Sequence, residues 1–200
     1  MSTKKRILSQ EEIARRVVQL GQEISVFYRN RPLVLIGVLN GAFIFMADLA
    51  RALTRDVEID FIRVASYGKS SVSSGVISLS KDVELDLAGK EVLLVEDIID
   101  TGRTLAFLKE FFLKKGAASV RICTLIDKKE RRQIEVEVDY RGFVVDEGFL
   151  VGYGLDCAEQ YRNLAAVYHL EDPHRPRQGT SGLSCGNPSI SDQIDSGGTP

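Results

Sequence analysis

The sequence predicts an α/β protein in which helices flank a mostly parallel central sheet. Two observations support this fold class: strand and helix patterns alternate along the chain, and the apolar runs are continuous rather than alternating. The run LVLIGVL at residues 33–39 is the clearest, and it indicates a strand that is covered on both faces, as in a parallel sheet. Successive strand and helix units then favour right-handed crossovers.

The composition shows no strong electrostatic bias. The 200 residues are 44% hydrophobic and 27% charged, which suits one domain or one domain and a tail. Because the net charge is −2, we expect neither a nucleic-acid nor a membrane partner. No apolar run approaches the roughly 18 residues that span a bilayer, and no secretory signal is expected. Three widely spaced cysteines argue against a disulfide framework or a structural zinc site, which favours a cytoplasmic location.

The first part of the chain predicts a helix followed by a strand–turn–helix unit. Ser9 and Glu12 form a capping-box signature, and apolar residues at helical spacing predict an amphipathic helix over residues 10–29. After the strand at 33–39, Asn40 and Gly41 indicate a tight turn, and residues 42–53 predict a second helix.

The middle of the chain predicts a hairpin and another strand–helix unit. Residues 57–67 are rich in β-branched and aromatic residues and predict a strand, with residues 76–80 as its return strand. The small, polar loop 68–75 suits a mobile lid, although a surface loop with no role fits the same composition. A strand begins at residues 91–95, and a helix follows from Leu105 to its C-cap near Gly116.

The last part of the chain predicts further strands and a tail. We expect strands at 119–127, 138–145 and 149–156, a short helix at 158–164 and an edge strand at 166–170. From residue 175 onward Gly, Ser and Pro dominate, and such a stretch cannot bury enough apolar surface to offset its ordering entropy. The expected organisation is a domain at residues 1–174 and a disordered tail at residues 175–200.

The stretch VLLVEDIIDTGRTL at residues 92–105 carries the strongest functional signal. Its apolar run ends in Glu96, Asp97 and Asp100, at the carboxyl end of a parallel strand, where ligands bind in such sheets. Residues 101–104 then lead into a helix N-terminus, whose amides and dipole favour anions. The carboxylates would repel phosphate but suit ribose hydroxyls or a hydrated Mg²⁺. The stretch therefore predicts a site for a ribose 5-phosphate.

Other kinds of site find less support. The sequence has no P-loop, no GxGxxG after a strand and no GxSxG elbow. His169 and His174 lack ligand spacing with any cysteine, so we expect them on the surface or in the core. A solvated acidic surface is the simpler alternative for the three carboxylates. The apolar strand before them and the Thr-Gly-Arg-Thr turn after them argue against it.

Four stretches together resemble the type I phosphoribosyltransferases, in particular their 6-oxopurine (hypoxanthine-guanine) branch. They are VLNGAF (38–43), ASYG (65–68), VEDIIDTGRTL (95–105) and FLVGYGLDCAEQYRNL (149–164). The third is specific to the superfamily, whereas the last, together with Lys128 after TLID, selects purine over orotate or uracil. The resemblance covers about residues 8–170.

The resemblance implies both a fold and an activity. The fold would carry a small hood formed by the terminal segments and a flexible loop, and the chain would form homo-oligomers, either dimers or tetramers. The activity would be the Mg²⁺-dependent transfer of a 5-phosphoribosyl group in purine salvage. Phosphoribosyl pyrophosphate and hypoxanthine or guanine would give IMP or GMP and pyrophosphate.

Carried onto this sequence, the resemblance also implies residue roles at the sugar. Glu96 and Asp97 would hold the ribose hydroxyls, directly or through Mg²⁺. Asp100 would be the general base or acid for the proton on purine N7. The 5-phosphate would be bound by four residues of the following turn: Thr101, Gly102, Arg103 and Thr104.

Further roles concern the base and the leaving group. For the purine, Lys128 would donate to O6, Phe149 would stack on the ring and the Leu150 backbone would read its edge. For the leaving group, Asp156 would ligate a second Mg²⁺ and Arg162 would contact pyrophosphate.

Two more segments complete the implied site. Ser66 and Tyr67 would lie on the loop that closes over the reacting centre. The turn at Asn40 and Gly41, with a cis peptide, would offer amides to pyrophosphate. The family commonly has Lys where Asn40 stands, so this chain lacks that charge.

Two other functions stay open at this point. The acceptor could be another base such as xanthine, and the sequence does not rank hypoxanthine against guanine. The chain could also be a regulator that kept the fold and binds nucleotide or RNA without catalysis. The near-neutral charge speaks against RNA, and the presence of Asp100, Lys128 and Asp156 together speaks against lost activity.

Overall fold

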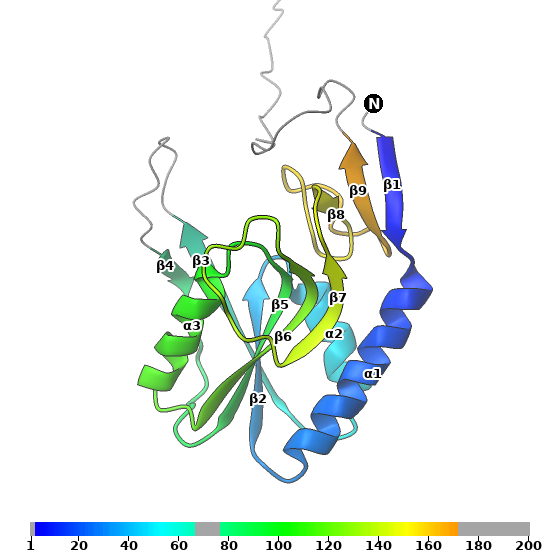
Figure 1. Ribbon diagram of the computed structural model, residues 1–200. Helices are drawn as coiled ribbons and strands as arrows, with labels where there is room; N and C mark the ends of the chain where they lie inside the picture. The colour runs from blue at the N-terminus through cyan, green and yellow to red at the C-terminus, as the bar shows by residue number, and fades with distance from the viewer. Residues whose placement is uncertain (1–2, 67–76, 172–200) are drawn as a thin grey trace, which may run out of the picture.

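The fold is built on two β-sheets. The structure, a computed structural model, describes residues 3–66 and 77–171 (Figure 1). In the larger sheet β4 is antiparallel to its neighbour and all other neighbours are parallel, which confirms the expected fold class. In order across this sheet, its strands are β4 (Ile77–Lys81), β3 (Glu58–Ser66), β2 (Leu33–Leu39), β5 (Glu91–Ile99), β6 (Ser119–Lys128) and β7 (Tyr140–Val145).

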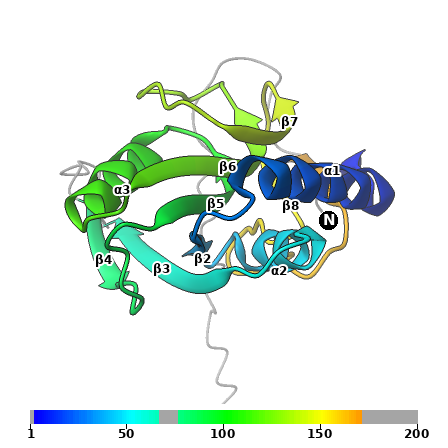
Figure 2. The ribbon, with the colours of Figure 1, turned by 90° about the horizontal axis from the view of Figure 1, so that it is seen from below.

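Three helices cover the two faces of this sheet. Figure 2 shows α1 (Gln10–Tyr28) and α2 (Phe43–Ala52) on one face and α3 (Arg103–Lys114) on the other. The predicted capping box opens α1, because the Ser9 hydroxyl accepts from the Glu12 amide while the Glu12 carboxylate accepts from the Ser9 amide. Just after the C-terminal end of α3, Gly116 has a left-handed φ of 90°, as expected for a C-cap glycine.

The continuous apolar strands are buried on both faces. On β2, Leu33 and Leu35 belong to the core beneath α1 and α2, whereas Val34 and Ile36 belong to the core beneath α3. β5 repeats this alternation over residues 92–95. The lack of polar alternation in the sequence thus has a direct cause, since neither face of these strands meets solvent.

The smaller sheet forms the hood beyond the carboxyl ends of the parallel strands (Figure 1). Its strands, in order, are β1 (Thr3–Leu8), β9 (Val167–Glu171) and β8 (Leu150–Val151). β9 is antiparallel to both neighbours. The two ends of the described chain therefore build the cover over one edge of the larger sheet, as the resemblance implied.

Several expected elements differ in the structure. The helix expected at 158–164 is wrong: this segment consists of turns, with positive φ at Ala158, Glu159 and Tyr161. The strand expected at 149–156 is reduced to Leu150–Val151, because residues 152–155 turn back in a Gly152–Leu155 bridge. The edge strand expected at 166–170 is instead the central strand of the hood. β5 also continues to Ile99, so Glu96 and Asp97 lie within the strand.

Some expectations cannot be compared with the structure. The loop at 68–75, Tyr67, His174 and the tail at 175–200 lie outside the described residues. Cys123 is a buried free thiol. Within residues 3–66 and 77–171, no helix is long and apolar enough to cross a membrane.

Candidate active site

A pocket of about 300 Å³ opens where β5 passes into α3. It lies at the carboxyl ends of the parallel strands, which is where α/β sheets bind ligands. Most of its wall comes from the acidic stretch: Glu96, Asp97, Ile98, Ile99, Asp100, Thr101, Gly102, Thr104 and Leu105. Val38 and Val64 complete it from β2 and β3. The pocket therefore contains most of the residues expected to hold a ribose 5-phosphate.

Glu96 and Asp97 form a buried acidic pair in this wall. Their residues are only 9% and 7% exposed. Burial raises the pKa of Glu96 well above its ordinary value, and the neighbouring Asp97 charge adds to this rise. Burial also raises the pKa of Asp97, and the nearby Arg162 guanidinium opposes the rise only in part. The pair is therefore poised to gain from any cation or hydroxyl donor that enters the pocket.

The turn after β2 packs directly against this pair. The peptide bond between Leu39 and Asn40 is cis, as the resemblance implied. A Cβ on Gly41 would lie 1.9 Å from Asp97 Oδ2, so only glycine fits beside the carboxylate. A Cβ on Gly154 would in turn lie 2.0 Å from the Gly41 carbonyl oxygen. The structure thus brings Asn40 and Gly41 to the acidic pair, and Gly154, in the turn after β8, packs against Gly41.

The turn at residues 101–104 leads into the N-terminus of α3. Gly102 is the N-cap, with φ 80°, and no side chain caps the helix. The first-turn amides of α3 lie at the pocket with the positive end of the helix dipole, and the Arg103 amide donates to the Thr101 hydroxyl oxygen at 3.4 Å. Gly102 also packs closely against the segment that contains Ile134, because a Cβ on Gly102 would lie 2.2 Å from the Ile134 carbonyl oxygen. This geometry suits an anion such as a phosphate.

Asp100 stands between the acidic pair and this turn. Its Oδ2 forms an ion pair with Arg131 Nη1 at 3.2 Å. Its Oδ1 is buried and has no hydrogen-bond partner among the described residues. A buried acceptor without a donor costs roughly 1–3 kcal/mol. This oxygen is therefore set to receive a proton or a donor from a ligand.

Lys128 lies at the end of β6 and is 7% exposed. Its Nζ forms an ion pair with Glu130 Oε2 at 2.9 Å. Leu150 is buried in β8, and Phe149, half-buried beside it, accepts a hydrogen bond from the Leu170 amide through its carbonyl oxygen. The residues expected to read the purine therefore come from the central sheet and from the hood, and they are not among the residues that line the pocket at the end of β5.

Asp156 and Arg162 lie together in the turns that follow β8. Arg162 Nη2 forms an ion pair with Asp156 Oδ1 at 2.8 Å, and Arg162 Nη1 donates to the Gly154 carbonyl oxygen at 2.9 Å. Asp156 Oδ2 accepts from the Glu159 amide. Both Asp156 oxygens are thus engaged, so a metal here would have to compete with Arg162. Ser66 ends β3, whereas Tyr67 lies outside the described residues.

The carboxylates fit Mg²⁺ only with help from a ligand. Mg²⁺ is usually held by one or two carboxylates together with substrate phosphates and water. Glu96 and Asp97 supply such a pair, and their raised pKa values show charge that a cation would stabilise. In the part of the chain that the structure describes, no three His, Cys, Asp or Glu side chains form a metal site by themselves.

The segment after Lys128 contains site neighbours that sequence reasoning missed. Arg131 pairs with Asp100, and Glu130 pairs with Lys128. The amides of Gln133 and Ile134 both donate to the Thr101 carbonyl oxygen at 3.0 Å. The one available signal was the charged run that follows the strand, which indicates a surface loop as readily as a site.

A comparison with known proteins defines the class. The model of the phosphoribosyl transferase domain matches residues 3–158. A hypoxanthine-guanine phosphoribosyltransferase from Aquifex aeolicus is 48% identical over 169 residues, which are 84% of this chain and 95% of that protein. One from Bacillus subtilis is 45% identical over 161 residues, covering 80% of this chain and 89% of that protein.

Solved structures agree with the sequence relatives. A hypoxanthine-guanine phosphoribosyltransferase from Bacillus anthracis superposes with a TM-score of 0.79 at 40% identity, covering 86% of this chain and 99% of that one. The chain therefore belongs to the phosphoribosyltransferase family, in its hypoxanthine-guanine branch.

Proposed function

We propose that the protein transfers the 5-phosphoribosyl group from phosphoribosyl pyrophosphate to hypoxanthine or guanine, giving IMP or GMP and pyrophosphate. The observation that carries this proposal is the buried Oδ1 of Asp100, which has no hydrogen-bond partner among the described residues. It shares one pocket with the acidic pair and the N-terminus of α3. The relatives named above support the choice of purine acceptor.

The sugar half of the substrate fits the pocket. The Glu96 and Asp97 carboxylates would accept hydrogen bonds from the ribose hydroxyls. The amides of Thr101, Gly102, Arg103 and Thr104, with the two threonine hydroxyls, would bind the 5-phosphate. The ribose hydroxyls would thus meet carboxylate acceptors and the 5-phosphate would meet amide and hydroxyl donors, all from one continuous stretch of the chain.

The reaction joins purine N9 to C1 of the ribose, and pyrophosphate leaves with the electron pair of the bond that breaks. The proton on N7 passes to the Asp100 carboxylate. A positioned base of this kind accelerates a reaction by about 10²–10⁴. Arg131, already paired with Asp100, would hold that carboxylate in place until the purine binds.

The purine half of the site supplies selectivity. Lys128 would donate to the exocyclic O6, which an ammonium group matches, whereas the amino group of adenine would face another donor. Phe149 would stack on the ring and the Leu150 backbone would read its edge. A buried polar mismatch of this kind can reject the wrong base by roughly 10⁴.

The leaving group would be met by Arg162 and by amides of the turn at Asn40 and Gly41. Mg²⁺ held by Glu96, Asp97 and substrate oxygens, and a second ion at Asp156, would neutralise charge on the departing pyrophosphate. Because Arg162 pairs with the Asp156 carboxylate, Asp156 would hold an ion only after Arg162 turns away from it. Ser66 and Tyr67 would belong to a loop that excludes water from the cationic sugar.

The test is an assay with phosphoribosyl pyrophosphate, Mg²⁺ and four bases: hypoxanthine, guanine, xanthine and adenine. We expect turnover with the first two. Replacing Asp100 with Ala should lower kcat by about 10²–10⁴ and change the affinity for phosphoribosyl pyrophosphate far less. An unchanged kcat would remove Asp100 from the base role. Nucleotide binding in calorimetry with no turnover on any base would instead favour a non-catalytic regulator.

We also propose a cytoplasmic homo-oligomer, either a dimer or a tetramer. Large apolar side chains on α2 and β3, Phe43 at 44% and Ile59 at 45% exposed, support a contact between copies. Light scattering of the purified protein distinguishes a monomer from either assembly, and cell fractionation tests the location.

A further inference from the structure

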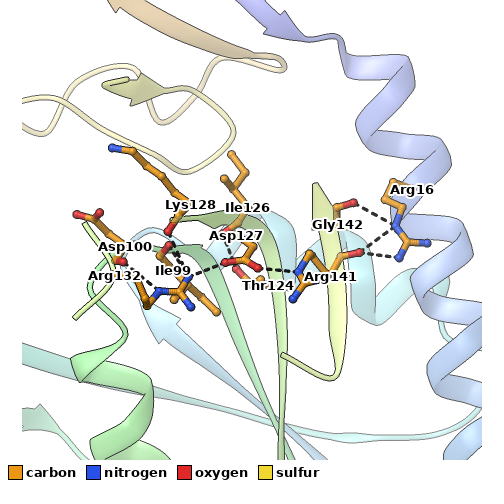
Figure 3. Close-up of polar contacts among 10 residues, drawn as sticks. All are labelled: Arg16, Ile99, Asp100, Thr124, Ile126, Asp127, Lys128, Arg132, Arg141 and Gly142. Atoms are coloured by element: carbon orange, nitrogen blue, oxygen red, sulfur yellow. Dashed lines mark hydrogen bonds and ion pairs between the residues drawn. The ribbon is translucent and has the colours of Figure 1, made fainter. Parts of the chain in front are cut away.

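Arg132 contacts the backbone on both sides of the candidate site. Its Nε donates to the Asp100 carbonyl oxygen at 3.3 Å, and its Nη2 lies 3.5 Å from the Ile99 carbonyl oxygen. The same Nη2 donates to the Lys128 carbonyl oxygen at 3.2 Å (Figure 3). One guanidinium thus joins Asp100, directly after β5, to Lys128, the last residue of β6.

The guanidinium is held in place by a buried ion pair. Arg132 Nη2 lies 2.5 Å from Asp127 Oδ1, and the two side chains are only 7% and 1% exposed. The other Asp127 oxygen binds Arg141 Nε at 2.7 Å, and Arg16 donates to the Arg141 carbonyl oxygen from α1 (Figure 3). The cluster therefore reaches from the candidate site to the helix on one face of the sheet.

The segment around Arg132 also touches the phosphate turn. The Gln133 and Ile134 amides bind the Thr101 carbonyl oxygen, and Gln133 Oε1 accepts from Arg103 Nε at 2.6 Å. These contacts explain why Gly102 must be small, because Arg132 Cδ and the Ile134 carbonyl oxygen both lie against it. Movement of Arg132 would therefore displace three parts of the site, namely Asp100, Lys128 and the turn at residues 101–104.

We propose that Arg132 is a positioning residue that fixes the spacing between the Asp100 carboxylate and the Lys128 ammonium. This inference rests on the proposed function, which gives those two groups the N7 proton and the O6 of one purine. The rigid purine holds N7 and O6 at a fixed distance from each other, so the two protein groups that contact them must also keep a fixed distance. Arginine suits this task because its planar fork offers several donors in fixed directions, whereas lysine offers a single point charge.

The energetics also favour a positioning role over a purely stabilising one. A buried ion pair is weak evidence for stability, because the desolvation of two charges offsets much of their attraction. The Asp127–Arg132 pair is nearly inaccessible to solvent, and two of its polar contacts reach carbonyl groups of site residues. The geometry of the Asp127–Arg132 pair is therefore linked to the positions of the site residues more than to the packing of the core.

The test compares variants of the full-length protein. Arg132→Met removes the donors, Arg132→Lys keeps the charge beside Asp127 but loses the fork, and Arg141→Met is the matched control. Among the described residues, Arg141 binds the same Asp127 carboxylate but makes no hydrogen bond or ion pair with Asp100 or Lys128. We would measure kcat, KM for hypoxanthine and for phosphoribosyl pyrophosphate, the preference for hypoxanthine over adenine, and the unfolding temperature.

Both Arg132 variants should lower kcat on the order of 10- to 100-fold, because a misplacement of about 1 Å can cost that much. The preference for hypoxanthine should fall with it, while Arg141→Met stays within about twofold of the wild type in both quantities. A structural role alone would lower the unfolding temperature and leave the base preference unmoved.

Folded Arg132 variants with wild-type kcat and base preference would overturn the proposal. If Arg132→Met fails to fold, Arg132→Lys decides. The double variant Asp127→Asn, Arg132→Gln is a further test, because it leaves no unpaired buried charge. A wild-type protein that makes no product refutes the proposed function itself, whereas active Arg132 variants beside an active wild type refute only the positioning role.

Discussion

Lys128 is a buried ammonium whose only ion pair in the described structure is with Glu130. Glu130 is exposed, and its pKa is lowered chiefly by the hydrogen bond from Lys128. A purine oxygen could take the place of the Glu130 carboxylate as the acceptor for this ammonium.

Replacing Lys128 with Ala should remove most of the preference for 6-oxopurines over adenine. We expect the ratio of kcat/KM values for hypoxanthine and adenine to fall at least about 10²-fold, because a buried polar mismatch can be worth roughly 10⁴. Lys129→Ala is the control, since Lys129 is the exposed neighbour on the same segment. If Lys128→Ala kept the full preference, O6 would be recognised by another group.

The acidic pair makes a prediction about pH. Because the folded-state pKa of Glu96 is raised, the folded protein binds its proton more tightly than the unfolded chain does. The stability of the Mg²⁺-free protein from this group is therefore full at acidic pH and is lost as the pH rises through the raised pKa.

Glu96→Gln should remove that loss. In Mg²⁺-free buffer at pH 8 we expect the variant to unfold at a higher temperature than the wild type, and we expect the difference to shrink toward pH 5. The variant should also bind Mg²⁺ and phosphoribosyl pyrophosphate more weakly, which calorimetry can measure. If the difference in unfolding temperature between the variant and the wild type were the same from pH 5 to pH 8, the raised pKa of Glu96 would be contradicted.

At the scale of elements, two glycines in turns can be compared, because Gly41 packs against a carboxylate whereas Gly89 has open space around it. Gly41→Ala would place a Cβ 1.9 Å from Asp97 Oδ2, so either the turn after β2 or the acidic pair must move. We expect kcat/KM to fall at least tenfold. Gly89 has φ 71° but open space around it, so Gly89→Ala should cost about 1–2 kcal/mol of stability and leave kcat/KM unchanged. Equal kinetic effects of the two substitutions would argue against the close packing of Gly41.

The elements that could be predicted from sequence are those whose pattern has a local cause. β2 and β5 are continuous apolar runs because both faces are buried, and α1 starts at a capping box. β1 was missed because TKKRIL is a largely polar strand that exists only through its pairing with β9. The turns at 158–164 have a helix-like composition, but Arg162 is tied to Gly154 and Asp156, and the backbone there takes positive φ.

The candidate site divides in the same way. The acidic stretch, the turn and the α3 N-terminus are consecutive in sequence, so their chemistry could be read from residue order. Arg131, Glu130 and Gly154 reach the site from other segments, and their pairing depends on how the end of β6 and the hood fold back. Proximity of this kind leaves no periodic pattern in a single sequence.

At the scale of the whole molecule, the domain limits make a prediction about residues 175–200. We propose that these residues lie outside the catalytic domain and play no part in catalysis, because their composition offers few apolar side chains to bury. A chain that ends at residue 174 should fold and keep kcat/KM within about twofold of the full-length protein. A loss of activity on truncation, with the unfolding temperature unchanged, would give the tail a functional role.

The pairing of β1 with β9 places Thr3 opposite Glu171, so the two ends of the described chain are neighbours. A short linker could therefore join them. New ends could be cut at the exposed Ala88 and Gly89, in the loop before β5, at the edge of the sheet remote from the substrate. The order in which the chain visits its strands is thus separable from the architecture that they form, and circular permutation can rearrange the gene while the catalytic scaffold stays the same.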